Sequence, residues 1–253
     1  MSQDLTDALV RHQVFLERYA TGVANRLQIS VNQARDYVIN SIISSNVLSV
    51  NTTTLQEEAE RIIKRGADAA YNEILELGVY DSTFLARLLI KEGVDGIIPS
   101  KELVEKRVAS TTMQVGLATN DPNRKLPTAF DKYTKSQAST MVQKVKDGQT
   151  LDQDTTEISS GVAAVTAGLL YMRTRSLSRT STLHASTVGK ETTLKENKKF
   201  VEQVEWVSVL DGQTTNYCRG KDGKRYKVGD GPRPPAHYNC RSLTRPVIKG
   251  IDS

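Results

Sequence analysis

The chain of 253 residues is 38% hydrophobic and only 6% aromatic, which allows one large domain or two small ones and favours polar-faced helices over a β-sandwich. No stretch reaches the roughly 18 apolar residues of a membrane span, and Met1-Ser-Gln-Asp has neither a basic nor an apolar segment, so we expect no membrane span and no secretory signal. The net charge is +5, but it is unevenly distributed. From Tyr171 to the end there are 16 Lys and Arg and 8 Asp and Glu, whereas residues 1–170 have 18 basic and 21 acidic residues. We therefore expect the acidic first part and the basic second part to contact different kinds of partner.

Periodic apolar residues predict helices in the first part of the chain. A first helix has apolar residues at a three-four spacing, and Ser30 is expected to cap a second helix over about 31–47. Thr54 and Glu57 have the spacing of a capping box that opens a third helix, and Gly78 is expected to end it.

Two shorter helices are expected next, over 80–91 and from a Ser100 cap to about residue 115. Residues 1–119 are therefore predicted to form a helical amino-terminal region that serves docking. The Pro- and Asn-rich segment 120–127 reads as a loop.

Helices continue beyond this loop. One is expected over about 128–146, and Thr150 with Gln153 has capping-box spacing for the next. The Ser-, Thr- and Lys-rich segment 177–200 predicts a long, largely exposed helix.

The pattern changes after Phe200. Residues 201–210 have the β-branched residues and the Trp of a strand, and turns with short strands follow. The predicted fold class is α+β: a mostly helical amino-terminal region followed by a small, loop-rich β module over 201–248 that contains a Cys/His knuckle.

The knuckle consists of Cys218, an 18-residue gap and then His237-x-x-Cys240. Zinc sites need four such ligands, and closely spaced pairs bring two of them together. Three ligands are present, and Asp211, Asp222 or a water is left to supply the fourth.

A metal site is one of several roles that these residue types allow. Cys218 and Cys240 are also consistent with small buried hydrophobic residues, with a disulfide formed after release from a reducing cytosol, or with a nucleophile that uses His237 as its base. Two Cys cannot build a secreted disulfide scaffold, and Trp206 is expected to anchor the core of the module.

The order of residues in the last fifty positions resembles the end of the Mu F-like minor head proteins of tailed phages, the phage head morphogenesis family. The resemblance is strong there, weaker back to about residue 130, and includes Gly148-Gln-Thr-Leu-Asp-Gln and Arg179-Thr-Ser. Thr215 and Ser242 stand where the family often has Cys, Gln213 where it has Arg, Tyr238 where it has Pro, and Ser181 where it has Glu. The matching residues with a structural role in the family motif are Trp206, Asp211, Thr214, Cys218, Pro235, His237, Cys240, Arg241 and Pro246.

The resemblance implies a head-morphogenesis domain over 128–253 in a minor capsid protein without catalytic residues. Such a protein is expected in the virion, at the capsid interior or portal vertex, after assembly in the host cytoplasm with the portal, major capsid and scaffold proteins. No cofactor is expected, and zinc is the one candidate that the Cys and His residues themselves allow. Packaged double-stranded DNA would be contacted through its phosphates, without base readout. The candidate phosphate-contacting residues are Lys221, Lys224, Arg225, Lys227 and Arg233.

The residues also allow two alternative functions. Toxin-like ADP-ribosyltransferase modules are fused to some head-morphogenesis domains, and Arg179-Thr-Ser-Thr with Glu191 or Glu205 has some of the required residue types. A free, non-specific DNA-binding protein is the second alternative, although no aromatic residues alternate with the Lys as in a single-strand groove.

Overall fold

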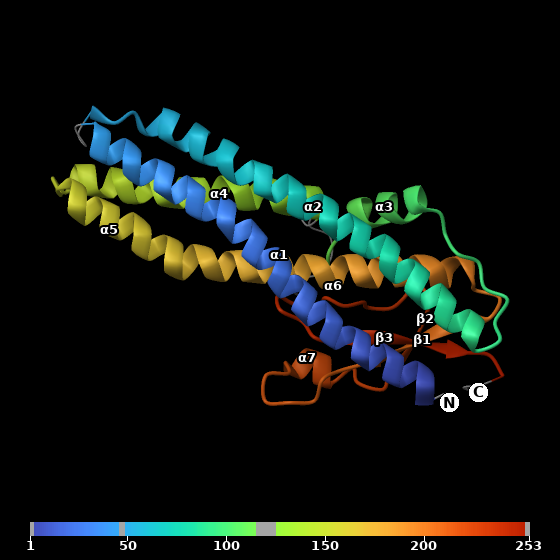
Figure 1. Cartoon of the computed structure of the whole chain (residues 1–253). Coiled ribbons are helices and arrows are strands. Elements are labelled where there is room, and N and C mark those ends of the chain that lie inside the picture. Colours follow the sequence, from blue (N-terminus) through green and yellow to red (C-terminus); the bar gives the residue numbers. More distant parts are fainter. Residues whose placement is uncertain (1–2, 46–48, 115–124, 251–253) are drawn as a thin grey trace. The chain divides into compact units, whose positions relative to one another are not determined.

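The computed structural model describes residues 3–45, 49–114 and 125–250, and they form an α+β protein as predicted (Figure 1). None of the helices in these ranges is long and apolar enough to cross a membrane. The helices are α1 (Gln3–Ser44), α2 (Thr52–Lys91), α3 (Lys101–Ser110), α4 (Leu126–Thr150), α5 (Thr155–Val165), the π-helical turn η3 (Thr166–Leu170), α6 (Tyr171–Glu196) and α7 (Asn216–Arg219). The strands are β1 (Val201–Val207), β2 (Arg225–Lys227) and β3 (Leu243–Ile248).

The three strands form one antiparallel sheet in the order β2-β1-β3. Val204 in the central strand lies opposite Tyr226 in β2 and Pro246 in β3. Proline at Pro246 is tolerated because β3 is an edge strand, which needs ladder hydrogen bonds on one side only. The predicted strand from residue 201 is confirmed and ends at Val207.

The described chain divides into two compact units. Unit 1 comprises residues 1–20, 73–126 and 179–253, and unit 2 comprises 21–72 and 127–178. Each unit therefore draws on segments that are far apart in the sequence, and α1, α2 and α6 contribute to both. The functional division between 1–119 and 128–253 stays a prediction.

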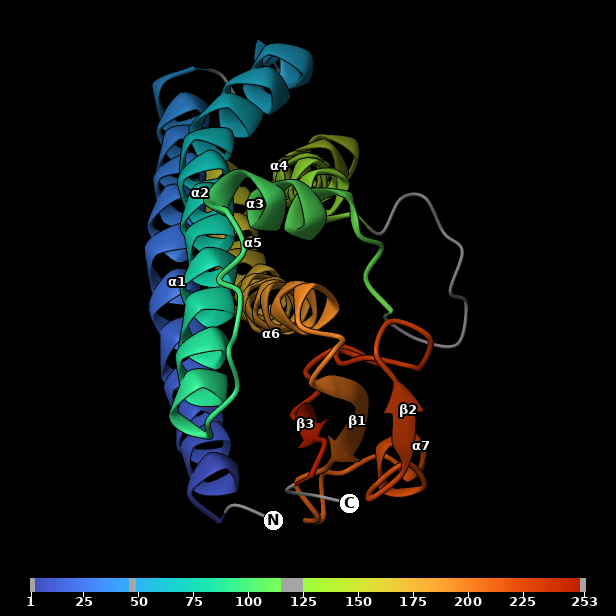
Figure 2. The ribbon, with the colours of Figure 1, turned by 90° about the vertical axis from the view of Figure 1, so that its right-hand side faces the viewer.

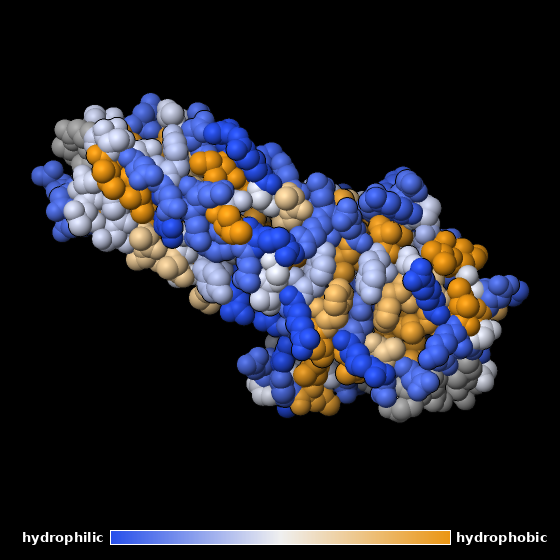
Figure 3. Space-filling model, viewed as in Figure 1, coloured by the Kyte–Doolittle hydropathy of each residue, from blue (hydrophilic) through white to orange (hydrophobic). Residues whose placement is uncertain are grey.

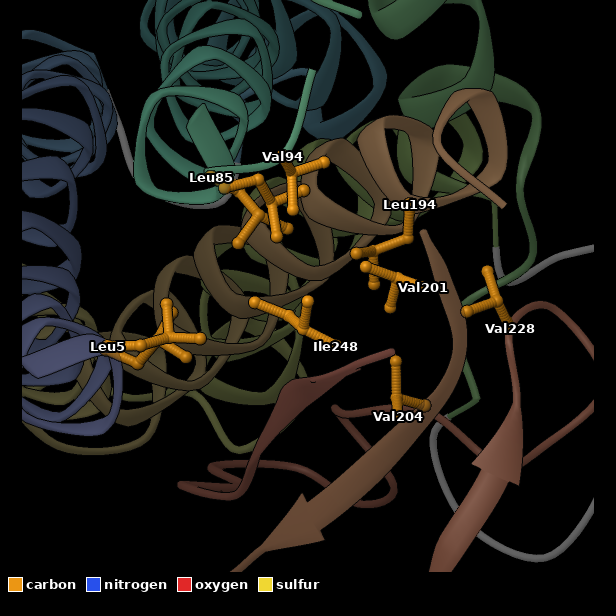
Figure 4. Close-up of a cluster of buried hydrophobic side chains, with 10 residues drawn as sticks. Leu5, Leu85, Val94, Leu194, Val201, Val204, Val228 and Ile248 are labelled. Carbon is orange, nitrogen blue, oxygen red and sulfur yellow. The ribbon is translucent and has the colours of Figure 1, made fainter. Parts of the chain in front are cut away.

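Unit 1 has an apolar core between helices and sheet. Leucines from α1, α2 and α6 pack with valines of the strands, and Figure 4 shows their side chains converging. In Figure 2 the sheet lies beside the carboxy-terminal half of α6. The buried residues of this cluster are Leu5, Leu9, Leu85, Leu89, Val94, Leu194, Val201, Val204, Val228 and Ile248.

Two helix ends predicted from the sequence are wrong, because the residues concerned serve a close helix contact instead. Ser30 lies inside α1, where its hydroxyl packs on Gly66 of α2; a Cβ on Gly66 would stand 2.0 Å from Ser30 Oγ. Gly78 lies inside α2 and faces the α6 backbone at Gly189, where a Cβ would stand 2.1 Å from the Gly78 carbonyl oxygen. Gly66 and Gly78 both lie within α2, where the absence of a side chain lets a neighbouring helix approach closely. Gly78 therefore does not end the helix.

Both predicted capping boxes are also displaced. Asn51, and not Thr54, caps α2, because its Oδ1 accepts from the amides of Thr53 and Thr54 at 3.0 and 3.2 Å. The cap of α5 is Asp154, which exchanges hydrogen bonds with Glu157 at 2.8 and 3.2 Å. The Ser100 cap of α3 is confirmed. This helix ends at Ser110, and residue 115, like 120–124 of the predicted loop, lies outside the described residues.

The expectation of an exposed helix over 177–200 is wrong. In α6 the ten consecutive residues from Ser181 to Lys190 are all buried, although most are polar or small. Some hydroxyl groups of α6 are satisfied inside the protein, as where Thr193 Oγ1 donates to the Ser82 carbonyl at 2.8 Å, whereas the buried hydroxyls of Ser181 and Thr182 have no hydrogen-bond partner among the described residues. The polar composition of this segment therefore reflects close helix packing in unit 1.

Candidate functional site

The knuckle is assembled from a short helix and a tight turn within unit 1. Thr215 caps α7, with its hydroxyl 3.4 Å from the Cys218 amide, and this turn directs Cys218 into the core. The second turn closes where the Cys240 amide donates to the His237 carbonyl at 3.2 Å, with Asn239 in the left-handed region at φ 58°. An Asn is one of the few residues with a side chain that adopts this conformation readily.

These two turns bring together all three predicted knuckle residues. Cys218 Sγ lies 3.2 Å from His237 Nε2 and 3.9 Å from Cys240 Sγ. Both Cys are buried and free of a disulfide, while His237 is half-buried. Within the described residues this is the cluster whose donor atoms are placed to hold a metal ion.

The two thiols of the knuckle differ in the direction of their pKa shifts. The hydrogen bond between the two sulfurs, together with burial, raises the pKa of Cys218, whereas the same hydrogen bond lowers the pKa of Cys240 to about 6. A Cys nucleophile paired with His needs a lowered pKa at the sulfur that His contacts. The sulfur that His237 contacts at 3.2 Å is therefore not the one whose pKa is lowered.

The other family-motif residues support the knuckle from outside. Trp206 is fully buried beside Cys218 and Cys240, and its indole N–H donates to Ser208 Oγ at 2.9 Å. The Arg241 guanidinium donates two hydrogen bonds, of 2.7 and 2.5 Å, to the Asp211 carboxylate. They hold the pKa of that carboxyl well below its usual range. The same motif places Thr214 in the turn that Asp211 begins, Pro235 in the buried lead-in to His237, and Pro246 in strand β3.

Four of the five candidate phosphate-contacting residues lie on or beside the β2 hairpin. Lys224, Arg225 and Lys227 are exposed, and Lys221 lies over the Tyr217 ring at 4.7 Å. Arg225 also contacts Glu205 at 3.3 Å.

The fifth candidate, Arg233, was wrongly predicted to be free for contact with phosphate. Its side chain is only 18% exposed, its guanidinium donates to the Thr112 carbonyl, and it lies 3.8 Å from Glu191. Its backbone amide also donates to Gln114 at 2.8 Å. Arg233 thus ties the segment before the knuckle to the chain beyond α3, and it is not available to a phosphate.

A buried charge cluster in unit 1 was not predicted from the sequence. Asp81 is fully buried, with one oxygen 2.7 Å from His12 Nε2 and the other 3.7 Å from Lys190 Nζ. A signal for it exists, because Asp81 falls in register with the buried Leu77 and Leu85 and so occupies a position on the apolar face of α2. A second residue without a predicted role is His184, a fully buried ring 3.2 Å from the Val108 carbonyl.

The ADP-ribosyltransferase alternative does not fit this arrangement. The sequence Arg179-Thr-Ser-Thr lies within helix α6 and not in a strand, Thr180 to Thr182 are buried, and Arg179 is paired with Glu17. No strand therefore presents these residues to a substrate.

An open apolar groove adjoins the knuckle within unit 1. It has a volume of about 490 Å³ and is bordered by Val10 and Val14 of α1 and by Val209 and Leu243 of the module. Val10, Val14 and Val209 are 42 to 51% exposed. Figure 3 shows apolar side chains gathered on this face between hydrophilic ones.

Comparison with known proteins agrees with the resemblance noted in the sequence. No curated protein and no solved structure matches the chain. Residues 136–245 match the family described as phage Mu protein F like protein, and this segment contains the entire knuckle together with Trp206, Asp211 and Arg241. Over residues 136–245 the chain is therefore similar to the phage Mu F-like proteins.

Proposed function

We propose that this protein is a minor capsid protein of a tailed bacteriophage, which joins the prohead at the portal vertex and contacts packaged DNA. The single observation that carries the proposal is the family match over residues 136–245, which covers the knuckle and the residues that hold it. The protein acts as a structural component in this proposal.

Features of unit 1 support contacts with both protein and DNA. The groove beside Val10 and Val14 offers exposed apolar surface, of the kind that marks protein interaction sites. The exposed Lys224 and Lys227 on the hairpin supply cations for a phosphate backbone. These two surfaces match a protein that lies between the head components and the DNA inside them.

The proposal is tested by quantitative mass spectrometry of purified, DNA-filled particles and of empty proheads from the source phage. We expect the protein in both, in a copy number no higher than that of the portal subunits. A copy number close to that of the major capsid protein would contradict the portal-vertex assignment. Absence from both particles would overturn the assignment to the head.

A further inference from the structure

The donor atoms of the knuckle are spaced like the corners of a tetrahedral metal site. With Zn–S near 2.3 Å and Zn–N near 2.0–2.1 Å, a regular tetrahedron places two sulfurs about 3.8 Å apart and sulfur and nitrogen about 3.6 Å apart. The observed separations are 3.9 Å between Cys218 Sγ and Cys240 Sγ and 3.2 Å between Cys218 Sγ and His237 Nε2. All three donor atoms lie within 4.8 Å of one another, so one ion can reach them together.

The His237 ring is held in the tautomer that a metal ion requires. Its Nδ1 lies 2.9 Å from the Tyr238 carbonyl oxygen, which can only accept a hydrogen bond, so Nδ1 carries the hydrogen. The lone pair is then on Nε2, the atom that faces Cys218. Metal-binding His residues are oriented in this way by a backbone or carboxylate acceptor.

No acidic side chain among the described residues completes the site. Asp211 holds Arg241 with both oxygens, and Asp222 accepts from the Ser208 amide at 2.7 Å. A polar group beside both sulfurs is the hydroxyl of Ser242, a residue that is 2% exposed and whose side chain interacts with Cys218 and with Cys240.

We propose that Cys218, His237 and Cys240 bind one Zn²⁺ ion, with the fourth coordination position open to a water molecule beside Ser242. The ion ties the turn that follows β1 to the turn that precedes β3. A loop-rich module with short strands gains much of its stability from such a tie, because metal binding contributes directly to folding. The site is independent of the proposed function, and its test does not need phage particles.

The first experiment measures metal binding by the full-length chain, purified under reducing conditions, stripped with a chelator and titrated with Co²⁺. We expect one equivalent to bind, with the thiolate-to-cobalt charge-transfer absorption and the strong visible bands of a tetrahedral site. Cys218→Ser and Cys240→Ser are expected to abolish the charge-transfer absorption or weaken it severely, and Zn²⁺ should displace the cobalt. A reduced wild-type chain that shows no cobalt bands would overturn the proposal, whatever the variants do.

A second pair of variants tests the open position. Ser242→Cys adds a third thiolate at a site where little else changes, so it is expected to bind Zn²⁺ more tightly in competition with a chromogenic chelator. Ser242→Ala is the matched control and is expected to bind no more tightly than the wild type. Equal affinity of the two variants, with both folded by circular dichroism, would contradict an open position beside Ser242.

Discussion

His184 is a buried imidazole whose protonation the fold opposes. Burial, with a smaller contribution from the charge of Arg233, lowers the pKa of this ring to about 3, against an ordinary value of 6.5. Between these values the unfolded chain binds a proton at this residue and the folded chain does not, so stability falls as the pH falls from 6.5 toward 3. The loss amounts to at most about 1.4 kcal/mol for each pH unit.

The substitution His184→Gln tests this coupling. Glutamine keeps an N–H donor for the Val108 carbonyl, which His184 Nε2 contacts at 3.2 Å, but it does not titrate. We expect the free energy of unfolding, from urea titrations at several pH values between 7 and 4, to depend less steeply on pH in the variant than in the wild type. Parallel pH profiles for the two chains would show that protonation of His184 is not coupled to unfolding.

At the scale of helices, α2 and α6 depend on a contact between two glycines. A Cβ on Gly189 would stand 2.1 Å from the Gly78 carbonyl oxygen, which is backbone and cannot rotate away. Gly189→Ala is therefore expected to destabilise the protein by about 1–3 kcal/mol or more, as overpacking of a core does. The change would appear as a lower melting temperature by circular dichroism.

Gly161→Ala in α5 is the matched control, because a Cβ there meets nothing within 4 Å. A helix interior favours Ala over Gly by about 0.5–1 kcal/mol, so this variant is expected to be neutral or slightly more stable. If both variants lowered the melting temperature equally, the contact between Gly78 and Gly189 would not be the cause.

The helices also show which structural features a single sequence can predict. The Ser100 cap, the strand that begins at Val201 and the pairing of Cys218 with His237 and Cys240 were predictable, since each depends on local hydrogen bonding or on short spacing. The continuity of α2 through Gly78 was not, because its glycine serves a residue more than a hundred positions away.

The burial of α6 could not be predicted either, because it also depends on residues that are distant in the sequence. The Ser and Thr residues of this helix have the composition of a solvated face, and the sequence does not show that other helices cover them, as Ser82 of α2 does where it hydrogen-bonds Thr193.

Arg233 was predicted to contact phosphate because it is a basic residue close in sequence to exposed Lys residues. Its hydrogen bonds with Thr112 and Gln114 join residues about 120 positions apart, so the local sequence does not indicate them. The buried Asp81 was detectable in principle, because a charged residue in register with an apolar face must find a partner.

At the scale of the whole molecule, the uneven charge makes the proposed contact with DNA testable. Lys221, Lys224 and Lys227 lie on one hairpin, so charge reversal of all three to Glu is expected to weaken binding to any double-stranded DNA to a similar degree, whatever its sequence. The dependence of log K on log salt should also become shallower, by about 0.9 for each phosphate contact that is lost. Fluorescence anisotropy with two unrelated duplexes at several salt concentrations measures both effects.

The matched control reverses three exposed Lys of α4, Lys132, Lys144 and Lys146, and so changes the net charge by the same amount. A local phosphate-binding surface predicts a large loss of affinity for the hairpin variant and a small one for the α4 variant. Equal losses would mean that only net charge matters, and the hairpin would then have no special role. Because phosphate contacts of this kind weaken steeply as salt rises, the hairpin is expected to bind DNA measurably at low salt and to need the crowded interior of a filled head at physiological salt.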